Sequence, residues 1–431
     1  MKPNAIVLAI FLTFSVSGLN AQEADERVAD LINKSDWFAL EEEYPRLRDN
    51  IRLAALKRFA DALICTHFNQ PEKALMLIDS LLVYHQKELG FYNIGNMVLL
   101  KSAILGKQGL YAQSADVMND FLHQISASFP KEDFPDHLFT ARLYDEIRNE
   151  QPPEIIRPDA DTEIPASIEK VGKDGAMIFV PVTIHGKEHR FIFDTGANST
   201  FVSERFAHEI GLRIVRESVP VAGIETGMGK IGTTDSIVIG DIIFKHPLIV
   251  VSMPNRTVDT LFQLDAVLGL DFIKRTGETR IYPGEGKMVF PKNRTPLPKT
   301  GRNLFLSGNG QLYLKAFSGK ERLIFHFDTG NTTGNLFDTY YRKHKEEIDG
   351  CGIKDTVRVG GFGGIRYLNG FRLSRVSLTT GCMTVDLNNI PVSVDKFSDV
   401  QQNEDGALGM DFIGLFEKVI INFDEMFVEV E

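Results

Sequence analysis

The sequence has little of what would place it in several large classes of proteins. Three cysteines in 431 residues allow at most one disulfide, and no cysteine or histidine spacing resembles a zinc site. The 58 acidic residues exceed the 47 basic ones, and the net charge of −11 argues against nucleic acid as a partner. After the N-terminus, no stretch approaches the ~20 apolar residues that a membrane-spanning helix needs. We therefore expect no metal, no cofactor and no transmembrane segment in the mature protein.

The overall composition is that of an ordinary globular protein. Hydrophobic residues make up 43% of the chain and charged residues 24%, and the length suffices for two or three domains with sizeable cores. Cys65 lies in a stretch with a helical pattern and is expected to be a buried apolar residue. Cys351 and Cys382 both fall in the C-terminal part of the chain, and their spacing leaves open whether they pair.

The N-terminus has the pattern of a signal peptide. A basic residue, Lys2, precedes an apolar run over residues 5–16, and the small residue Ala21 follows at a plausible cleavage point. This pattern predicts a signal peptide over residues 1–21 and a periplasmic or secreted protein. The alternative is an uncleaved membrane anchor.

Residues 22–150 have a helical pattern. Pro71 suits the first turn of a helix, and a similar segment begins 40 residues later at Gly109. The pair loosely resembles the turn and helix of tetratricopeptide-type repeats, although the usual repeat is 34 residues. A stack of helical hairpins with a groove for a protein partner is one interpretation, and a packing or pro-segment domain is the other. The apolar face of the first helix has 3.6-residue spacing and consists of Ala74, Leu75, Leu77, Ile78, Leu81 and Leu82.

Four prolines among polar residues predict a linker over residues 151–165. The all-β half is expected to begin near Ala166 and to contain two copies of one plan, at residues 166–292 and 304–431. Each copy starts with a strand, a Gly-containing turn and a second strand, and each ends in a hairpin. A connection over residues 293–303 joins the copies.

One phrase occurs in both copies. Phe-Asp-Thr-Gly stands at residues 193–196 and again at 327–330, each time after an apolar run typical of a β-strand. An apolar-apolar-Gly stretch follows each phrase, at residues 267–269 and 407–409. The combination resembles the signatures of aspartic proteases, and in particular the retropepsin-like family. The alternative is an unrelated duplicated β-domain.

The resemblance implies that Asp194 and Asp328 form a catalytic dyad between two lobes. Two carboxyl groups a few ångströms apart cannot both ionise readily, so they share one proton. The ionised member can then take a proton from water while the protonated member polarises the substrate carbonyl. Such a site hydrolyses peptide bonds without a metal or a covalent intermediate.

The neighbouring residues are expected to support this dyad. By resemblance, Thr195 and Thr329 hydrogen-bond across the lobe interface, and Gly196 and Gly330 let the chain turn tightly. Ala197 follows the first phrase as it does in retropepsins, whereas Asn331 follows the second. Asn331 is atypical at this position, which weakens the assignment of the second half-site as active, although asparagine tolerates turn geometry.

Two further carboxylates, Asp271 and Asp411, stand after the apolar-apolar-Gly stretches. Each precedes Phe-Ile, which favours a role as a helix N-cap over a role as an additional acid.

Glycine-rich stretches in both copies suggest flaps over a substrate. The first contains Gly223, Ile224 and Gly227, and the second contains Gly361, Phe362 and Gly363. Ordinary loops are the alternative, since glycine in a strand usually marks a bend or a close backbone approach. Neither stretch has the tyrosine typical of the pepsin flap, so both look more like the viral retropepsin dimer.

His326 stands two residues before Asp328 and therefore on the same strand face. In one interpretation His326 lines a substrate pocket. In the other it has only a structural role, with its hydrogen bonds made within the interface.

The sequence thus predicts a multidomain α and all-β protein, with a helical-hairpin repeat domain followed by a bilobal retropepsin- or pepsin-like β-barrel fold. The expected function is an exported aspartic endopeptidase, active as a monomer on a peptide or protein substrate. One rival is a catalytically idle peptide-binding protein of the same fold. Another is a helical-repeat scaffold for a protein partner.

Overall fold

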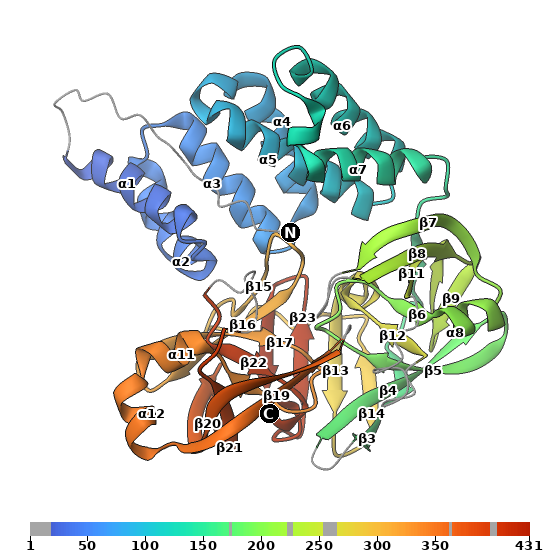
Figure 1. Ribbon diagram of the computed structural model, residues 1–431, viewed down its shortest axis with the longest axis vertical. Helices are drawn as coiled ribbons and strands as arrows, with labels where there is room; N and C mark the ends of the chain where they lie inside the picture. The colour runs from blue at the N-terminus through green and yellow to red at the C-terminus, as the bar shows by residue number, and fades with distance from the viewer. Residues whose placement is uncertain (1–18, 172–174, 222–226, 253–264, 362–363, 397–402) are drawn as a thin grey trace. The chain divides into compact units, whose positions relative to one another are not determined.

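The computed structural model describes residues 19–171, 175–221, 227–252, 265–361, 364–396 and 403–431. Its described residues form two compact units that divide between Pro153 and Glu154. The N-terminal unit is helical and the C-terminal unit is built mainly of β-sheet (Figure 1). N-terminal helices followed by a large β-sheet region are compatible with an α + β protease fold, as the sequence predicts.

The described part of the helical unit contains seven α-helices, and consecutive helices pack against each other. The predicted helix starts are correct, because Pro71 occupies the first turn of α4 and the segment after Gly109 forms α6. Gly90, with φ of 72°, interrupts α5 near its start. The predicted signal peptide falls largely outside the described residues, and α1 begins at Leu19. The helices are α1 (Leu19–Asn33), α2 (Trp37–Leu47), α3 (Ala54–His67), α4 (Pro71–Tyr84), α5 (Gln86–Lys107), α6 (Tyr111–Ile125) and α7 (Pro135–Glu146).

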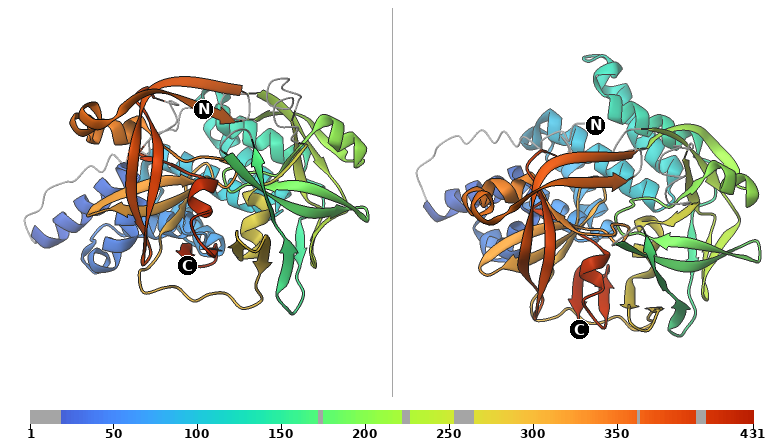
Figure 2. Two further views of the ribbon diagram at one scale, coloured as in Figure 1. Left: turned by 90° about the horizontal axis from the view of Figure 1, so that it is seen from below. Right: turned by 60° about the horizontal axis from the view of Figure 1, so that its bottom comes forward.

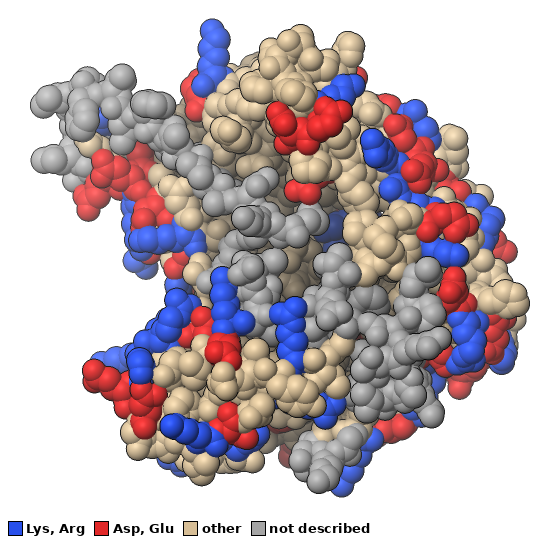
Figure 3. Space-filling model, in the orientation of Figure 1, with Lys and Arg blue, Asp and Glu red and all other residues tan. Residues whose placement is uncertain are grey.

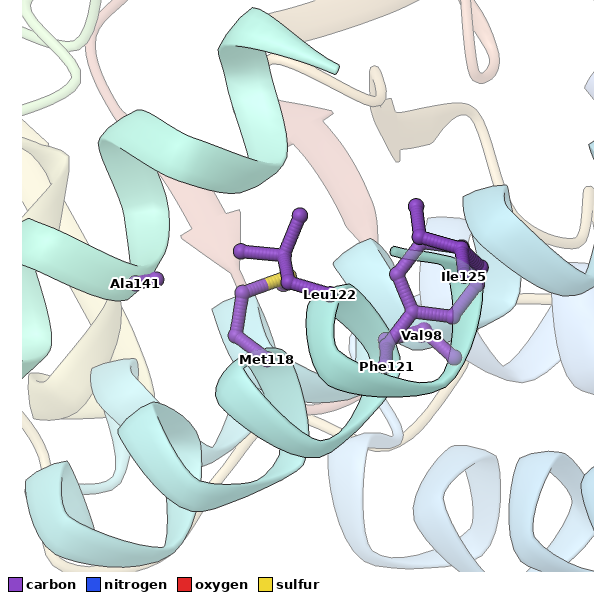
Figure 4. Packing of buried hydrophobic residues seen from close by; sticks show 6 residues of the cluster. All are labelled: Val98, Met118, Phe121, Leu122, Ile125 and Ala141. Carbon is purple, nitrogen blue, oxygen red and sulfur yellow. The ribbon is translucent and has the colours of Figure 1, made fainter. Parts of the chain in front are cut away.

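A hydrophobic core of the helical unit lies where α5, α6 and α7 meet (Figure 4). Residues of α6 spaced three and four apart point toward both neighbours, as an amphipathic helix requires. Met118 is fully buried, and Ala141 of α7 belongs to the same cluster. The buried members of this cluster are Val98, Met118, Phe121, Leu122, Ile125 and Ala141.

The first half of the β unit forms an 11-stranded sheet, called here the first sheet. Its centre is the run β4-β5-β12-β6, in which β5 and β12 are parallel and the other two pairings are antiparallel. The turn between β4 and β5 has positive φ at His185 and Gly186, which suits a tight two-residue hairpin. The strands are β1 (Glu154–Ile156), β3 (Ser167–Val171), β4 (Gly175–Ile184), β5 (Lys187–Phe193), β6 (Phe201–Ser203), β7 (Arg213–Val221), β8 (Gly227–Thr233), β9 (Ser236–Ile239), β10 (Ile242–Lys245), β11 (Leu248–Ser252) and β12 (Ala266–Leu268).

The second half forms an 8-stranded sheet, the second sheet, with the same plan. Its run β16-β17-β22-β18 repeats the order and the senses of pairing of β4-β5-β12-β6. The strands that follow in each sheet, β11-β8-β7 and β21-β20-β19, also correspond. The strands are β15 (Leu304–Leu306), β16 (Leu312–Ser318), β17 (Glu321–Phe327), β18 (Asn335–Leu336), β19 (Ile353–Gly361), β20 (Gly364–Thr380), β21 (Met383–Ser393) and β22 (Gly406–Leu408).

A third sheet contains strands from both halves. Its order is β2-β14-β13-β23-β24, so the two terminal hairpins lie side by side through the β13–β23 pairing. Figure 2 shows the red C-terminal hairpin between the yellow strands of the first half and the orange strands of the second. The strands are β2 (Thr162–Pro165), β13 (Glu278–Tyr282), β14 (Lys287–Phe290), β23 (Val419–Asn422) and β24 (Phe427–Val430).

The buried carboxylate of Glu278 stabilises the third sheet through hydrogen bonds. Glu278 is fully buried and accepts hydrogen bonds from the backbone N–H of Thr295 at 2.6 Å and from Nδ2 of Asn422 at 2.8 Å. Arg280 pairs with it at 2.7 Å. These contacts tie the connection between the two halves to strands from both of them.

The predicted linker over residues 151–165 is wrong over most of its length. Strand β1 pairs with β10 of the first sheet, and β2 pairs with β14 of the third sheet. The β unit therefore starts near Glu154 rather than near Ala166. Proline is compatible with this arrangement because β2 is an edge strand and Pro165 is its last residue.

The cysteines are all free. Cys351 at the end of α12 (Lys345–Cys351) and Cys382 in the turn between β20 and β21 are both exposed, and Cys65 is only partly buried. Within the described residues, no helix is long and apolar enough to cross a membrane. On the face shown in Figure 3, basic and acidic side chains are interspersed over the surface.

Candidate active site

The two Asp-Thr-Gly phrases lie at equivalent strand ends. Strand β5 ends at Phe193, and the backbone N–H of Asp194 donates to the carbonyl oxygen of Leu268 at 3.0 Å. Strand β17 ends at Phe327, and the N–H of Asp328 donates to the carbonyl of Leu408, also at 3.0 Å. The apolar-apolar-Gly stretches are thus β12 and β22, each paired in parallel with the strand that carries the carboxylate.

The two phrases are linked by four reciprocal hydrogen bonds. Oγ1 of Thr195 donates to the carbonyl of Phe327 at 2.8 Å and accepts from the N–H of Thr329 at 3.0 Å. Oγ1 of Thr329 makes the matching bonds to the carbonyl of Phe193 and the N–H of Thr195, at 2.8 and 3.0 Å. Both threonines are fully buried, so these bonds fix the two loops against each other in an environment without competing water.

Replacing Thr195 with valine is expected to lower the free energy of unfolding by roughly 2–6 kcal/mol. Valine has nearly the same shape but leaves the Phe327 carbonyl and the Thr329 N–H buried without partners, at about 1–3 kcal/mol each. Denaturant unfolding of the full chain measures this, with valine at the exposed Thr333 as the matched control. A loss below about 0.5 kcal/mol would mean that the reciprocal bonds contribute little.

Gly196 and Gly330 have a different role from the predicted one. Neither is among the residues with positive φ, so the turn itself does not demand glycine. Instead, a Cβ on Gly196 would overlap the carboxyl group of Asp328, and a Cβ on Gly330 would overlap that of Asp194. Glycine is required because each carboxyl group lies against the backbone of the opposite loop.

The structure therefore brings Asp194 and Asp328 together, with each carboxyl group against the glycine of the opposite loop. Burial raises the pKa of both carboxyls, and the neighbouring charge of Asp328 helps to raise the pKa of Asp194 to about 8. The Asp328 side chain is still 23% exposed, so small molecules can reach the pair. Two such carboxyls hold one proton over a wide pH range.

The hydrogen bonds to the two carboxylates differ. Oδ1 of Asp194 accepts from the N–H groups of Gly196 at 2.7 Å and Ala197 at 3.1 Å. Oδ1 of Asp328 accepts from Gly330 at 2.9 Å, and the N–H of Asn331, which also acts on this carboxyl to lower its pKa, donates to the backbone carbonyl of Asp328 at 3.1 Å. One backbone contact is the same in both halves. The carbonyl of Ala197 accepts from the N–H of Leu270 at 2.8 Å, and the carbonyl of Asn331 accepts from the N–H of Met410, also at 2.8 Å.

The predicted N-cap role of Asp271 and Asp411 is wrong in detail. The N-caps of α10 (Leu270–Ile273) and α13 (Met410–Ile413) are Gly269 and Gly409. Oδ1 of Asp271 instead accepts from the N–H and the hydroxyl of Thr200, both at 2.8 Å. Burial raises the pKa of Asp271 to about 6. In the second half, Asp411 accepts from the N–H of Gly334 at 2.8 Å, so both carboxylates support the loop that follows the phrase.

Of the predicted flap residues, Gly227 and Gly361 are described, and both lie at the ends of paired strands. Gly227 is the first residue of β8, which pairs with β7, and Gly361 is the last residue of β19, which pairs with β20. Gly223, Ile224, Phe362 and Gly363 lie outside the described residues.

His326 lies beside the dyad. Its Nδ1 is 3.8 Å from Oδ2 of Asp328, and its side chain is 17% exposed. Burial lowers the pKa of His326, so the neutral imidazole is favoured. Its Nε2 is buried without a hydrogen-bond partner among the described residues.

Tyr313 and Glu404 lie on the same side of the site as His326. The sequence analysis does not identify either of them. The Tyr313 ring lies 5.7 Å from the His326 ring, and its hydroxyl donates to Oε1 of Glu404 at 2.7 Å. A signal was present in the sequence. The two phrases are 134 residues apart, and the same offset relates Tyr313 to Phe179 and His326 to Ile192.

Comparisons with known proteins address the first half of the β unit. Residues 180–275 match the family model described as "gag-polyprotein putative aspartyl protease", a segment that includes Asp194 and the stretch 267–269. No curated protein matches the chain. Over residues 180–275 the chain is thus similar to a retropepsin-like aspartyl protease, which suggests peptidase activity on a peptide substrate.

Proposed function

We propose that the protein is an exported aspartic endopeptidase in which Asp194 and Asp328 activate one water molecule between two retropepsin-like lobes. The observation that carries the proposal is the pair of carboxyl groups held together by the Thr195 and Thr329 bonds at equivalent strand ends. The aspartyl-protease match over residues 180–275 supports it independently. In this proposal the first and second sheets are the two lobes.

The dyad has the groups that peptide hydrolysis requires. The ionised carboxylate removes a proton from water while the protonated carboxyl donates a hydrogen bond to the substrate carbonyl. As water attacks, the protonated carboxyl gives its proton to the carbonyl oxygen, so the adduct is a neutral diol and the dyad keeps the proton taken from water. The diol collapses when the dyad gives that proton to the amide nitrogen, a diol hydroxyl returns its proton to the dyad, and the C–N bond breaks. The pair then again holds one proton, so no metal or covalent enzyme intermediate enters this cycle.

The pH dependence of peptide cleavage tests the proposal. Activity requires one proton on the pair, so it should fall at low pH where both groups are protonated and at high pH where both are ionised. Because the pKa of Asp194 is raised to about 8 and that of Asp328 lies above its usual 3.8, the optimum should extend toward neutral pH. The measurement is kcat/KM between pH 3 and 9 on a denatured-protein digest. A kcat/KM that rises continuously from pH 3 to pH 9 would contradict a one-proton dyad.

Export is tested by the mass of the protein recovered from its native host. The charged start, the apolar run and Ala21 lead us to expect a chain that begins at Gln22. Cleavage there would also remove the first three residues of α1. An intact mass that includes Met1 would point to the uncleaved anchor instead.

A further inference from the structure

The two sheets present matching rows of side chains next to the dyad. In the first sheet, Phe179 pairs with Ile192, Ile192 with Val267, and Val267 with Phe201. Residues directly opposite each other on neighbouring strands have side chains on the same face, so these four form one row across β4, β5, β12 and β6. Ile192 stands two residues before Asp194 and hence shares its strand face.

The second sheet contains the equivalent row. Tyr313 pairs with His326, His326 with Ala407, and Ala407 with Asn335. His326 stands two residues before Asp328, and its Nδ1 lies 3.8 Å from that carboxyl, which places this row at the dyad. The registers relate the rows position by position: Phe179 to Tyr313, Ile192 to His326, Val267 to Ala407 and Phe201 to Asn335.

The two rows differ in polarity at nearly every position. The first is part of an apolar cluster of Met177, Phe179, Ile192 and Val267, against which Ala197 and Phe201 pack. In the second, the residue equivalent to Met177 is Gln311, whose Oε1 lies 3.1 Å from the Tyr313 hydroxyl. The residue equivalent to Ala197 is the polar Asn331. The small side chain of Ala407 separates His326 from Asn335.

Two polar atoms of the second row are buried without hydrogen-bond partners among the described residues: Nε2 of His326 and Nδ2 of Asn335. Asn335 as a whole is only 8% exposed. Buried polar atoms are nearly always paired, so unpaired ones at a substrate site indicate where a ligand bonds. The amide nitrogen of Asn335 donates hydrogen bonds. The neutral imidazole of His326 can accept at Nε2 when Nδ1 carries the proton toward Asp328.

We propose that the second row is a subsite for a carboxamide side chain, glutamine or asparagine, and that the first row binds a large apolar side chain on the other side of the scissile bond. The carboxamide oxygen accepts from Asn335, and the carboxamide NH2 donates to His326. An acidic side chain is disfavoured because Glu404 and the singly charged dyad already border this subsite. The proposal rests on the proposed peptidase function and defines its substrate class.

Cleavage-site profiling of the full chain on a proteome-derived peptide digest tests this preference. We expect cleaved bonds to have a large apolar residue on one side and Gln or Asn on the other. In matched synthetic peptides, leucine in place of that Gln should lower kcat/KM about 10- to 100-fold, since it leaves buried polar atoms unpaired. Cleavage mainly between two apolar residues would overturn the proposal.

Variants of His326 show whether the preference arises from this row. His326→Ile restores the residue found at the equivalent position of the first row, so the fold should be retained, and the Gln-to-Leu ratio should fall below about 3-fold. His326→Gln keeps a hydrogen-bonding group and should retain most of the preference. His208→Leu, on an exposed turn of α8 (Glu204–Glu209), is the control. An unchanged ratio in His326→Ile would refute the assignment.

Binding separates this inference from the proposed function. The Asp194→Asn chain, probed on an array of the same synthetic peptides, should bind the Gln peptides more tightly than the Leu peptides. If no peptide is ever cleaved but this binding preference is found, the peptidase proposal fails and the subsite stands. If peptides are cleaved but neither assay favours a carboxamide, the subsite fails and the peptidase proposal stands.

Discussion

Replacing Asp328 with asparagine is expected to lower kcat/KM for peptide cleavage by at least 10²–10⁴-fold, the usual contribution of one general acid–base group. Asparagine keeps an oxygen that can accept from the Gly330 N–H, so the loop should be preserved, but it can neither ionise nor carry the shared proton. Asp194→Asn should cause a loss of similar size because the two carboxyls act as one unit. Peptide cleavage by each purified variant at the wild-type pH optimum measures the effect.

The control for these variants is Asp159→Asn, since the Asp159 side chain is 93% exposed in an ion pair with Lys292. It should retain wild-type activity. All three variants should unfold with the same cooperativity as the wild type. Activity within a few-fold of wild type in Asp328→Asn would place the catalytic site elsewhere.

The second large effect concerns how many chains make one site. Both carboxylates and all four threonine bonds belong to a single chain, so the monomer should be the active unit. The two halves have also diverged in sequence. The residue equivalent to Ala197 is Asn331, and the residue equivalent to Ile192 is His326. Identical chains related by a two-fold axis would present identical surfaces. We therefore expect specific activity to be independent of protein concentration.

A mixture of Asp194→Asn and Asp328→Asn chains tests the same point without dilution. If each site forms within one chain, every site in the mixture contains one asparagine, and activity should stay at least 10²-fold below wild type. If sites formed between chains, about a quarter of wild-type activity would return by random pairing in an equal mixture. Such rescue, or a steep loss of specific activity on dilution, would contradict a one-chain site.

Much of the β unit follows from local sequence pattern. The strand, turn and strand before each phrase and the hairpin at the end of each copy are present in the order predicted, because alternating apolar residues and Gly-containing turns are local signals. The error over residues 151–165 has the opposite cause. Prolines and polar residues are typical of a linker, whereas β1 and β2 are strands through partners about 90 to 125 residues away.

The sequence predicts the site residues that belong to the repeated motif. It does not predict roles that depend on contacts between residues far apart in the chain. Two copies of one phrase sufficed to pair Asp194 with Asp328. The reason for Gly196 and the true bonds of Asp271 depend on which atoms approach from the opposite loop or from Thr200, and no spacing shows that. Asn335 was missed because an asparagine after a turn looks ordinary until its equivalence to Phe201 is noticed.

Cleavage of a proteome-derived peptide digest by the wild-type chain and by Asp194→Asn, with new termini identified by mass spectrometry, tests the central claim most directly. We expect many new termini with the wild type near neutral pH and fewer than one hundredth as many cleavage events with the variant. Equal numbers of new termini in the two samples, or none in either, would contradict an aspartic peptidase built on Asp194 and Asp328.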